Sequence, residues 1–144
     1  MNLTHLVLVD SSAWFALKDT KDPHHNTAIQ FLATFTGKLI TTNFVIDETV
    51  TLTLYRLGYP VARELGQELW AKKYANIVYI SKADQRAAWE LFKKYDDKEF
   101  SFTDCTSFVV MERLGLLYAF AFDEHFEQTG QFIRLPRAQP PLPL

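Results

Sequence analysis

Short apolar runs that alternate with helical patterns constrain the fold of this chain more than any other feature. The runs that we expect to form buried strands cover residues 6–9, 38–42, 76–80, 116–122 and 132–135. Apolar residues at helical spacing predict helices over residues 11–17, 27–35, 43–57, 61–74, 81–95 and 104–114. Because helices connect nearly all successive strands, the pattern predicts a three-layer α/β/α fold with a central, mostly parallel sheet.

Residues 101–126 show this organisation most clearly. Asp104 opens a helix behind good capping residues, and an apolar run over 116–122 then suits a buried strand. Asp123 follows that run directly. In open α/β sheets, ligands bind outside the carboxyl ends of the strands. We therefore expect Asp104 and Asp123 to face the same crevice.

Two more acids occupy comparable positions. Asp10 directly follows the first predicted strand, and Glu48 lies in the second turn of the helix after the second strand. Each has an ordinary explanation by itself, since Asp10 suits the N-cap of the next helix and Glu48 suits a solvent-exposed helix face. Taken together with Asp104 and Asp123, they place four carboxylates at one rim of the sheet. Their mutual repulsion would be costly there without a cation.

An all-oxygen set of ligands indicates which metal such a rim would bind. Carboxylate oxygens suit hard divalent ions, so we expect Mg²⁺ or Mn²⁺. Zinc would require histidine or thiolate neighbours, which the pattern does not supply. Metals held by carboxylates serve phosphate chemistry, because they neutralise a phosphodiester and activate a water molecule.

Length and composition limit the organisation of the chain. Its 144 residues fit one domain, predicted over 1–135, and a tail over 136–144 holds four of the six prolines. Cys105 is the single cysteine, so no intrachain disulfide can form, and its apolar neighbours favour a core residue over a catalytic thiol. No basic leader precedes an apolar run, and no run approaches the ~18 residues needed to cross a bilayer. We expect a cytoplasmic protein with no membrane contact.

The charge balance bears on the substrate class. Fifteen lysines and arginines against 17 acids give a formal charge of −2, which argues against a generic basic nucleic-acid binder. If four of the acids bind a metal, the remaining charges sum to +2. A polyanionic substrate is therefore compatible with the composition.

Four segments of the chain, each containing one of these acids, resemble a known family. The order and setting of the segments LVLVDSSAW, NFVIDET, SFTDCTSFVVMERLG and FAFDEHF are similar to the PIN domain, in particular to the VapC-type ribonuclease toxins of toxin–antitoxin pairs. The resemblance spans residues 6–135. It implies a catalytic metal site made of Asp10, Glu48, Asp104 and Asp123, with the hydroxyls of Ser12 and Ser107 as supporting groups. The family often has Thr or Ser two residues before its last acid, where this chain has Ala121.

The leading hypothesis from these residues is a Mg²⁺-dependent endoribonuclease that cuts RNA by water attack on a phosphodiester. A non-catalytic PIN-like interaction module and a stand-alone PIN ribonuclease in RNA processing are the alternatives. A receiver domain or phosphohydrolase with Asp10 as the phosphate acceptor is disfavoured, because the acid pair beside the first strand is missing.

The VapC resemblance also implies protein partners. A small antitoxin would lie across the helices near the crevice and place a basic group among the four acids. Its predicted contacts are the large side chains of Tyr55, Leu57, Tyr59 and Trp70. The same side chains suit core packing or the homodimer that we also expect.

Overall fold

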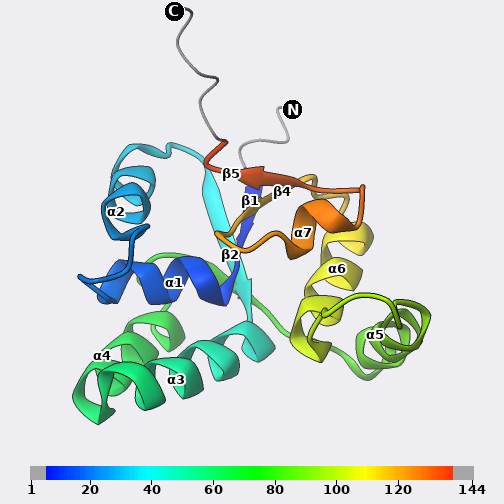
Figure 1. Cartoon of the computed structure of the whole chain (residues 1–144), viewed down its shortest axis with the longest axis horizontal. Coiled ribbons are helices and arrows are strands. Elements are labelled where there is room, and N and C mark those ends of the chain that lie inside the picture. The colour runs from blue at the N-terminus through cyan, green and yellow to red at the C-terminus, as the bar shows by residue number, and fades with distance from the viewer. Residues whose placement is uncertain (1–5, 138–144) are drawn as a thin grey trace, which may run out of the picture.

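A five-stranded sheet forms the centre of the protein. The computed structural model describes residues 6–137, so residues 138–144 of the predicted tail lie outside the described part. The strands are β1 (Leu6–Val9), β2 (Lys38–Thr42), β3 (Asn76–Val78), β4 (Tyr118–Phe120) and β5 (Ile133–Leu135). They lie in the order β3-β2-β1-β4-β5, and all four neighbouring pairs are parallel (Figure 1). The predicted parallel sheet is confirmed.

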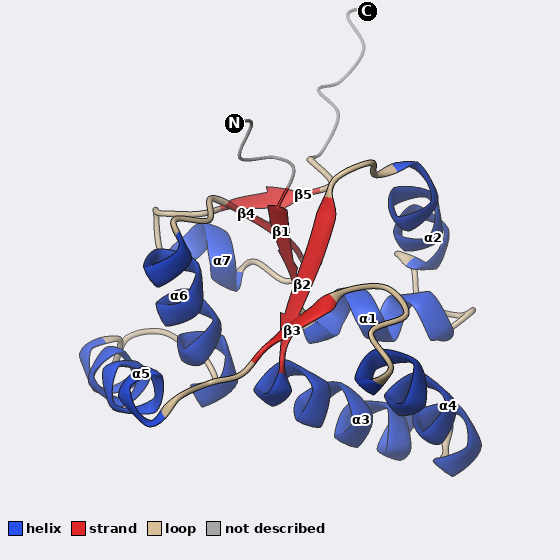
Figure 2. Cartoon of the chain, turned by 180° about the vertical axis from the view of Figure 1, so that it is seen from behind, coloured by secondary structure: helices blue, strands red, loops and turns tan. Residues whose placement is uncertain are grey.

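Helices cover both faces of this sheet (Figure 2). One face carries α1 (Ser11–Lys18), α2 (His25–Thr34), α3 (Asn43–Leu57) and α4 (Tyr59–Trp70). The other face carries α5 (Lys82–Lys94), α6 (Phe102–Leu114) and α7 (His125–Gln128). The predicted three-layer arrangement is therefore confirmed. No helix within residues 6–137 combines the length and the apolar character needed to span a bilayer.

The strand β1 joins the two hydrophobic cores. Successive side chains of a strand point to opposite faces of the sheet. Val7 and Val9 pack into the core that contains the buried indole of Trp14, whereas Leu8 packs into the core that contains Phe108. The side chains of Val7, Leu8 and Val9 are fully buried. This explains why the first strand reads as a continuous aliphatic run rather than an alternating one.

Several element ends differ from those that the sequence predicts. The helix predicted to start at Asn43 has its N-cap one residue earlier, at Thr42, whose hydroxyl accepts a hydrogen bond from the Val45 amide at 3.0 Å. The Asn43 side chain instead accepts a hydrogen bond from the Ile80 amide at 2.8 Å, and thereby fixes the chain that leaves β3. Pro60 does not follow the end of a helix but lies in the first turn of α4, where its missing amide hydrogen costs nothing.

Other predicted boundaries shift by a few residues. The second helix begins at His25 and α4 ends at Trp70, while β3 and β4 are only three residues long. The short helix α7 was not predicted, because four residues are too few to show a helical repeat.

Neighbouring strands β1 and β4 determine where the acids meet. Val9 pairs with Phe120, and the Asp10 amide donates to the Phe120 carbonyl at 2.9 Å just beyond the pair. The chain order along the sheet reverses here, since β2 and β3 lie on one side of β1 and β4 and β5 on the other. A crevice outside the carboxyl ends of the strands is expected at such a point. Asp10 and Asp123 follow the two strands that flank it.

Candidate active site

Asp10 directly follows β1 at the edge of the sheet where the crevice is expected, with 1% of its surface exposed. It is the N-cap of α1, because its Oδ2 accepts hydrogen bonds from the Ser12 amide at 3.2 Å and from the Ser12 hydroxyl at 2.7 Å. Its other oxygen, Oδ1, is buried and has no hydrogen-bond partner among the described residues. Asp10 can therefore cap α1 with one oxygen and take part in the site with the other.

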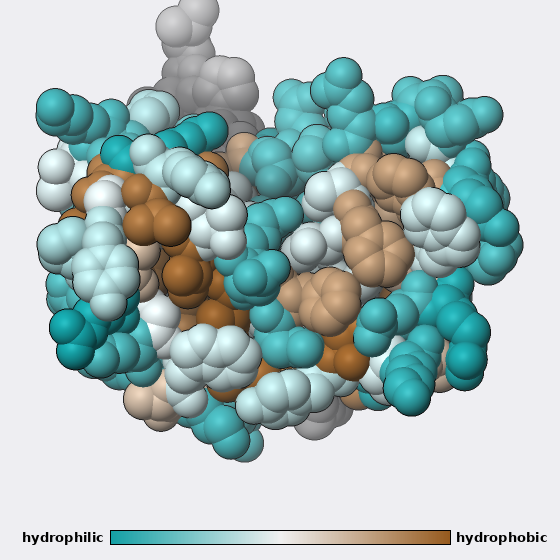
Figure 3. Space-filling view, turned by 90° about the horizontal axis from the view of Figure 1, so that it is seen from below, coloured by the Kyte–Doolittle hydropathy of each residue, from teal (hydrophilic) through white to brown (hydrophobic). Residues whose placement is uncertain are grey.

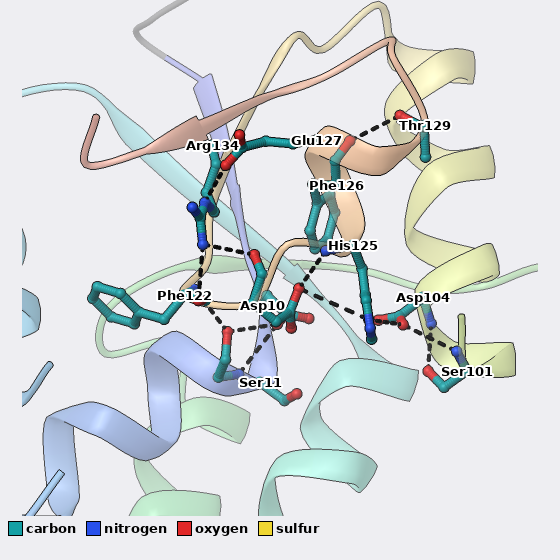
Figure 4. A network of polar contacts seen from close by, with 12 residues as sticks. Asp10, Ser11, Ser101, Asp104, Phe122, His125, Phe126, Glu127, Thr129 and Arg134 are labelled. Atoms are coloured by element: carbon teal, nitrogen blue, oxygen red, sulfur yellow. Dashed lines mark hydrogen bonds and ion pairs between the residues drawn. The ribbon is translucent and has the colours of Figure 1, made fainter. Parts of the chain in front are cut away.

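The Ser12 hydroxyl connects the ends of the two central strands. It donates to Asp10 after β1 and accepts a hydrogen bond from the Phe122 amide, after β4, at 3.0 Å. Figure 4 shows these contacts around Asp10 and Phe122. Ser12 thus fixes the position of one acid relative to the segment that carries Asp123.

Glu48 enters the crevice from α3, where the Ser11 hydroxyl donates to its Oε1 at 2.6 Å. Asp104 enters from the first turn of α6 and forms a reciprocal capping box with Ser101: each backbone amide donates to the other side chain at 3.0 Å. This cap fixes the Asp104 carboxylate, which is 4% exposed. Sequence reasoning did not assign a role to Ser11.

His125 is the functional-site residue that sequence reasoning missed most clearly. Its Nδ1 lies 2.6 Å from Asp104 Oδ2 and 3.8 Å from Asp123 Oδ1, and its backbone amide donates to Asp123 Oδ1 at 3.0 Å (Figure 4). The expectation that histidine neighbours are missing is therefore wrong. The one signal in the sequence was its position two residues after Asp123. The contact with Asp104 could not be predicted, because it depends on how α7 orients the ring.

Arg134, on β5, supports the segment that bears Asp123. Its Nη1 donates to the carbonyls of Phe122 at 2.8 Å and of Asp123 at 3.0 Å, and its guanidinium pairs with Glu127 (Figure 4). No pattern in the sequence indicates this role, because β5 becomes adjacent to β4 only in the folded sheet.

The four acids produce an excess of negative charge in a desolvated place. Burial raises the pKa of Asp10 well above its ordinary value, and repulsion from Asp123 and Asp104 adds to the rise. Burial also raises the pKa of Glu48, although the Ser11 hydrogen bond opposes the change. The pKa of Asp104 is raised by burial too, against the hydrogen bond from the Ser101 amide. Asp10 and Glu48 are thus each coupled to Asp104 and Asp123, so the structure places the four predicted acids within electrostatic reach of one another.

The donor chemistry of the crevice fits a hard divalent cation. Among residues 6–137, no three His, Cys, Asp or Glu side chains are already gathered in a metal-binding arrangement. The orphaned Oδ1 of Asp10 nevertheless lacks a positive or donor partner, and the Asp104 and Asp123 carboxylates repel its charge. A bound cation would satisfy that oxygen and relieve the repulsion.

Ser107 does not share the contacts of Ser12. It lies one turn after Asp104 on α6, fully buried, and its hydroxyl has no hydrogen-bond partner among the described residues. The structure thus links only one of the two predicted supporting hydroxyls to an acid. Ala121, the departure from the family pattern, is buried at the end of β4, and its amide donates to the Leu135 carbonyl at 3.2 Å.

Comparisons with known proteins agree with this geometry. The family model of the PIN domain matches residues 7–131. The 23S rRNA-specific endonuclease VapC20 of Mycobacterium tuberculosis is 33% identical over 125 residues, which cover 87% of this chain and 95% of that protein. A VapC ribonuclease of Archaeoglobus fulgidus is 33% identical over 114 residues, which cover 76% of this chain and 72% of that protein.

A solved structure extends the similarity to the fold. The crystal structure of Mycobacterium tuberculosis VapC20, named as a sarcin-ricin loop cleaving toxin, superposes with a TM-score of 0.83 at 32% identity. The match covers 88% of this chain and 96% of that one. These similarities, together with four acids at the carboxyl ends of a parallel sheet, show that the chain belongs to the PIN domain family and, within it, to the VapC-type toxin ribonucleases.

Proposed function

We propose that the protein is a Mg²⁺- or Mn²⁺-dependent endoribonuclease that acts as the toxin of a toxin–antitoxin pair in the cytoplasm. The observation that carries the proposal is the buried, unpartnered Oδ1 of Asp10 in a crevice with Glu48, Asp104 and Asp123. The names of the relatives, which are ribonucleases and an rRNA endonuclease, support RNA as the substrate. The family membership removes the receiver-domain alternative.

Each residue of the site has a defined part in this chemistry. Asp10, Glu48, Asp104 and Asp123 would hold the metal, which when bound neutralises the phosphodiester and lowers the pKa of a water molecule. Ser12 orients Asp10, the Ser11 hydroxyl orients Glu48, and His125 orients Asp104. Arg134 holds the backbone that positions Asp123. Such positioning contacts determine how well a carboxylate is aligned.

Cleavage assays test the proposal directly. Purified protein should cut 23S rRNA or a loop fragment of it when Mg²⁺ or Mn²⁺ is present, and EDTA should abolish the products. Heating the protein before the assay controls for contaminating heat-stable nucleases. If no RNA is cut with either metal, the non-catalytic interaction module becomes the better description.

Metal binding is expected to release protons. Because the pKa values of Asp10, Glu48 and Asp104 are raised, the apo site retains protons above the usual carboxyl range, and a cation must displace them. Affinity for Mn²⁺ should therefore increase with pH through that range. Calorimetry of Mn²⁺ binding near pH 6, in buffers of different ionisation enthalpy, measures the release. A heat that does not depend on the buffer would contradict a tightly coupled cluster of acids.

The predicted antitoxin contacts lie on an exposed face. Tyr55 is 82% exposed, Tyr59 64% and Trp70 50%, whereas Leu57 is half-buried. Figure 3, viewed from below, shows apolar surface on the side of α3 and α4, separated by hydrophilic residues from a second group on the side of α5. We propose that a small antitoxin covers the α3–α4 face and directs a basic group to the acids. The predicted homodimer would use the same aromatic side chains.

Co-expression with the product of the neighbouring small open reading frame tests this partnership. We expect the two proteins to co-purify and RNA cleavage to be suppressed, because the basic group competes with the metal. The double variant Tyr55→Ala with Tyr59→Ala should weaken co-purification and restore cleavage. A nuclease whose activity no co-purifying protein changes would instead be a stand-alone PIN ribonuclease.

A further inference from the structure

An open groove lies directly beside the acid site. Its volume is about 530 Å³, and its walls come from α2 and from the segments that follow β4 and β5. The side chains that matter for its chemistry are His24, Gln30, Phe31, Phe122, Arg134 and Arg137. Phe122 immediately precedes Asp123, and its amide donates to the same Ser12 hydroxyl that binds Asp10, so the groove is adjacent to the acid site.

The charge of the groove is opposite to that of the acid site. His24, Arg134 and Arg137 are the only ionisable side chains among its described lining residues, and none of these lining residues is a carboxylate. Arg134 is held by the carbonyls of Phe122 and Asp123 and is paired with the Glu127 carboxylate, which is not a lining residue, whereas Arg137 is exposed. Two arginines against this one carboxylate, in a chain with a net charge of −2, favour an anion beside Arg137.

Aromatic rings form one wall of the groove. The His24 imidazole stacks on the Phe122 ring with the centroids 4.4 Å apart and the planes 6° from parallel. Ser12 fixes the Phe122 amide, so this pair has a defined position relative to Asp10. A flat aromatic surface beside cations is the arrangement by which proteins bind the bases and phosphates of single-stranded nucleic acids.

The groove over α5 provides an instructive comparison. It is lined by Trp89 and Phe92 together with lysines, but Asp96 and Glu99 also line it. Carboxylates beside the cations reduce the attraction for a phosphate. The groove next to Asp123 therefore suits a nucleotide better, although its aromatic surface is smaller.

We propose that this groove binds the nucleotide next to the scissile phosphodiester of a single-stranded RNA segment. Arg137, together with Arg134, contacts the flanking phosphate, and the base stacks against the pair formed by His24 and Phe122. The proposal rests on the proposed ribonuclease function and names where its substrate lies. A basic antitoxin segment suits the groove less well, because its described lining residues include no carboxylate and the nearby Glu127 is already paired with Arg134.

Binding of RNA without cleavage tests the subsite. The probe is a fluorescein-labelled single-stranded RNA dodecamer, titrated with the protein in EDTA and followed by fluorescence anisotropy at several salt concentrations. Arg137→Ala should raise the Kd about tenfold, and the slope of log K against log salt should become shallower by about 0.7, the contribution of one phosphate contact on a single strand. His24→Ala should raise the Kd with little change in slope, since it removes stacking.

Arg63→Ala is the matched control, because Arg63 is an exposed arginine on α4, away from the groove. We expect this variant to bind RNA with the Kd and slope of the wild type. In cleavage assays with Mn²⁺, Arg137→Ala should raise KM and leave kcat nearly unchanged. Melting temperatures of all variants verify that they are folded.

The outcomes separate this proposal from the proposed function. If the wild type cuts RNA but Arg137→Ala matches Arg63→Ala in Kd, slope and KM, the subsite is wrong and the ribonuclease remains. If the wild type binds RNA with the expected Arg137 dependence but cuts none with Mn²⁺, the ribonuclease function fails and the subsite remains. A wild type that does not bind the RNA dodecamer also overturns the subsite.

Discussion

Replacement of Asp10 by asparagine is expected to lower RNA cleavage by about a hundred- to a thousandfold, since one buried group that stabilises developing charge commonly contributes that much. Asparagine retains the shape of the side chain and can still cap α1. It removes the charge that a cation in the crevice would require. Initial rates on an rRNA fragment, measured with saturating Mn²⁺ for both proteins, provide the comparison. A variant that cuts at the wild-type rate would show that Asp10 is not part of the catalytic site.

Asp47→Asn is the matched control for this variant. Asp47 precedes Glu48 on α3 but is exposed, and it points about 100° away around the helix. Its replacement removes the same charge from the same neighbourhood without entering the crevice. We expect cleavage by Asp47→Asn to match that of the wild type.

The same Asp10 variant should melt at a higher temperature than the wild type when metal is absent. Because the folded-state pKa of Asp10 is raised above 3.8, the folded protein binds the proton more tightly than the unfolded chain. The free energy of unfolding therefore falls as the pH rises from about 3.8 through the raised pKa. Asparagine does not undergo this loss, so the difference should vanish at low pH and reach a few degrees at pH 7. Mn²⁺ should then stabilise the wild type and not the variant.

Loss of the Ser12 hydroxyl is expected to have the second-largest effect. Ser12→Ala leaves the Phe122 amide without its acceptor and removes one donor from Asp10. Groups that orient a metal ligand typically contribute 10- to 100-fold to activity or metal affinity, and an unpaired buried amide costs about 1–3 kcal/mol. We therefore expect a 10- to 100-fold lower kcat/KM and a lower melting temperature. Steady-state kinetics and thermal unfolding would measure the two effects.

Ser107→Ala tests the specificity of that result. Ser107 is fully buried, but its hydroxyl has no hydrogen-bond partner among the described residues. Its removal should leave cleavage unchanged and make the fold equally or more stable, because no satisfied polar contact is lost. Equal losses in the Ser12 and Ser107 variants would indicate that both act by packing alone.

The cysteine on α6 illustrates a prediction that needed little tertiary information. Cys105 is fully buried among apolar side chains, and burial, with the nearby Asp104 charge, raises its pKa to about 11. Its thiol therefore stays protonated at neutral pH, and a core role is confirmed over a nucleophilic one.

The local sequence pattern was sufficient to predict the fold class and to identify the four acids. Apolar runs of strand length, separated by capped helices, permit few arrangements other than a parallel sheet covered on both faces. In such a sheet, any residue that directly follows a strand lies at the same edge as the others, so Asp10 and Asp123 could be placed together from the sequence. Glu48 and Asp104 followed because their helices begin at that edge.

Contacts between distant segments were decided only by the tertiary structure. His125 reaches Asp104 because a single-turn helix follows Asp123, and Arg134 reaches the Asp123 carbonyl because β5 pairs with β4. Ser11, and not its neighbour Ser12, donates to Glu48 because α1 packs against α3. Hydrogen bonds of this kind depend on orientation and on distances of about 3 Å, which residue type and spacing do not encode. The sequence thus determines which edge of the sheet carries the acids, whereas the packing of α7 and β5 decides what holds them there and forms the basic groove beside them.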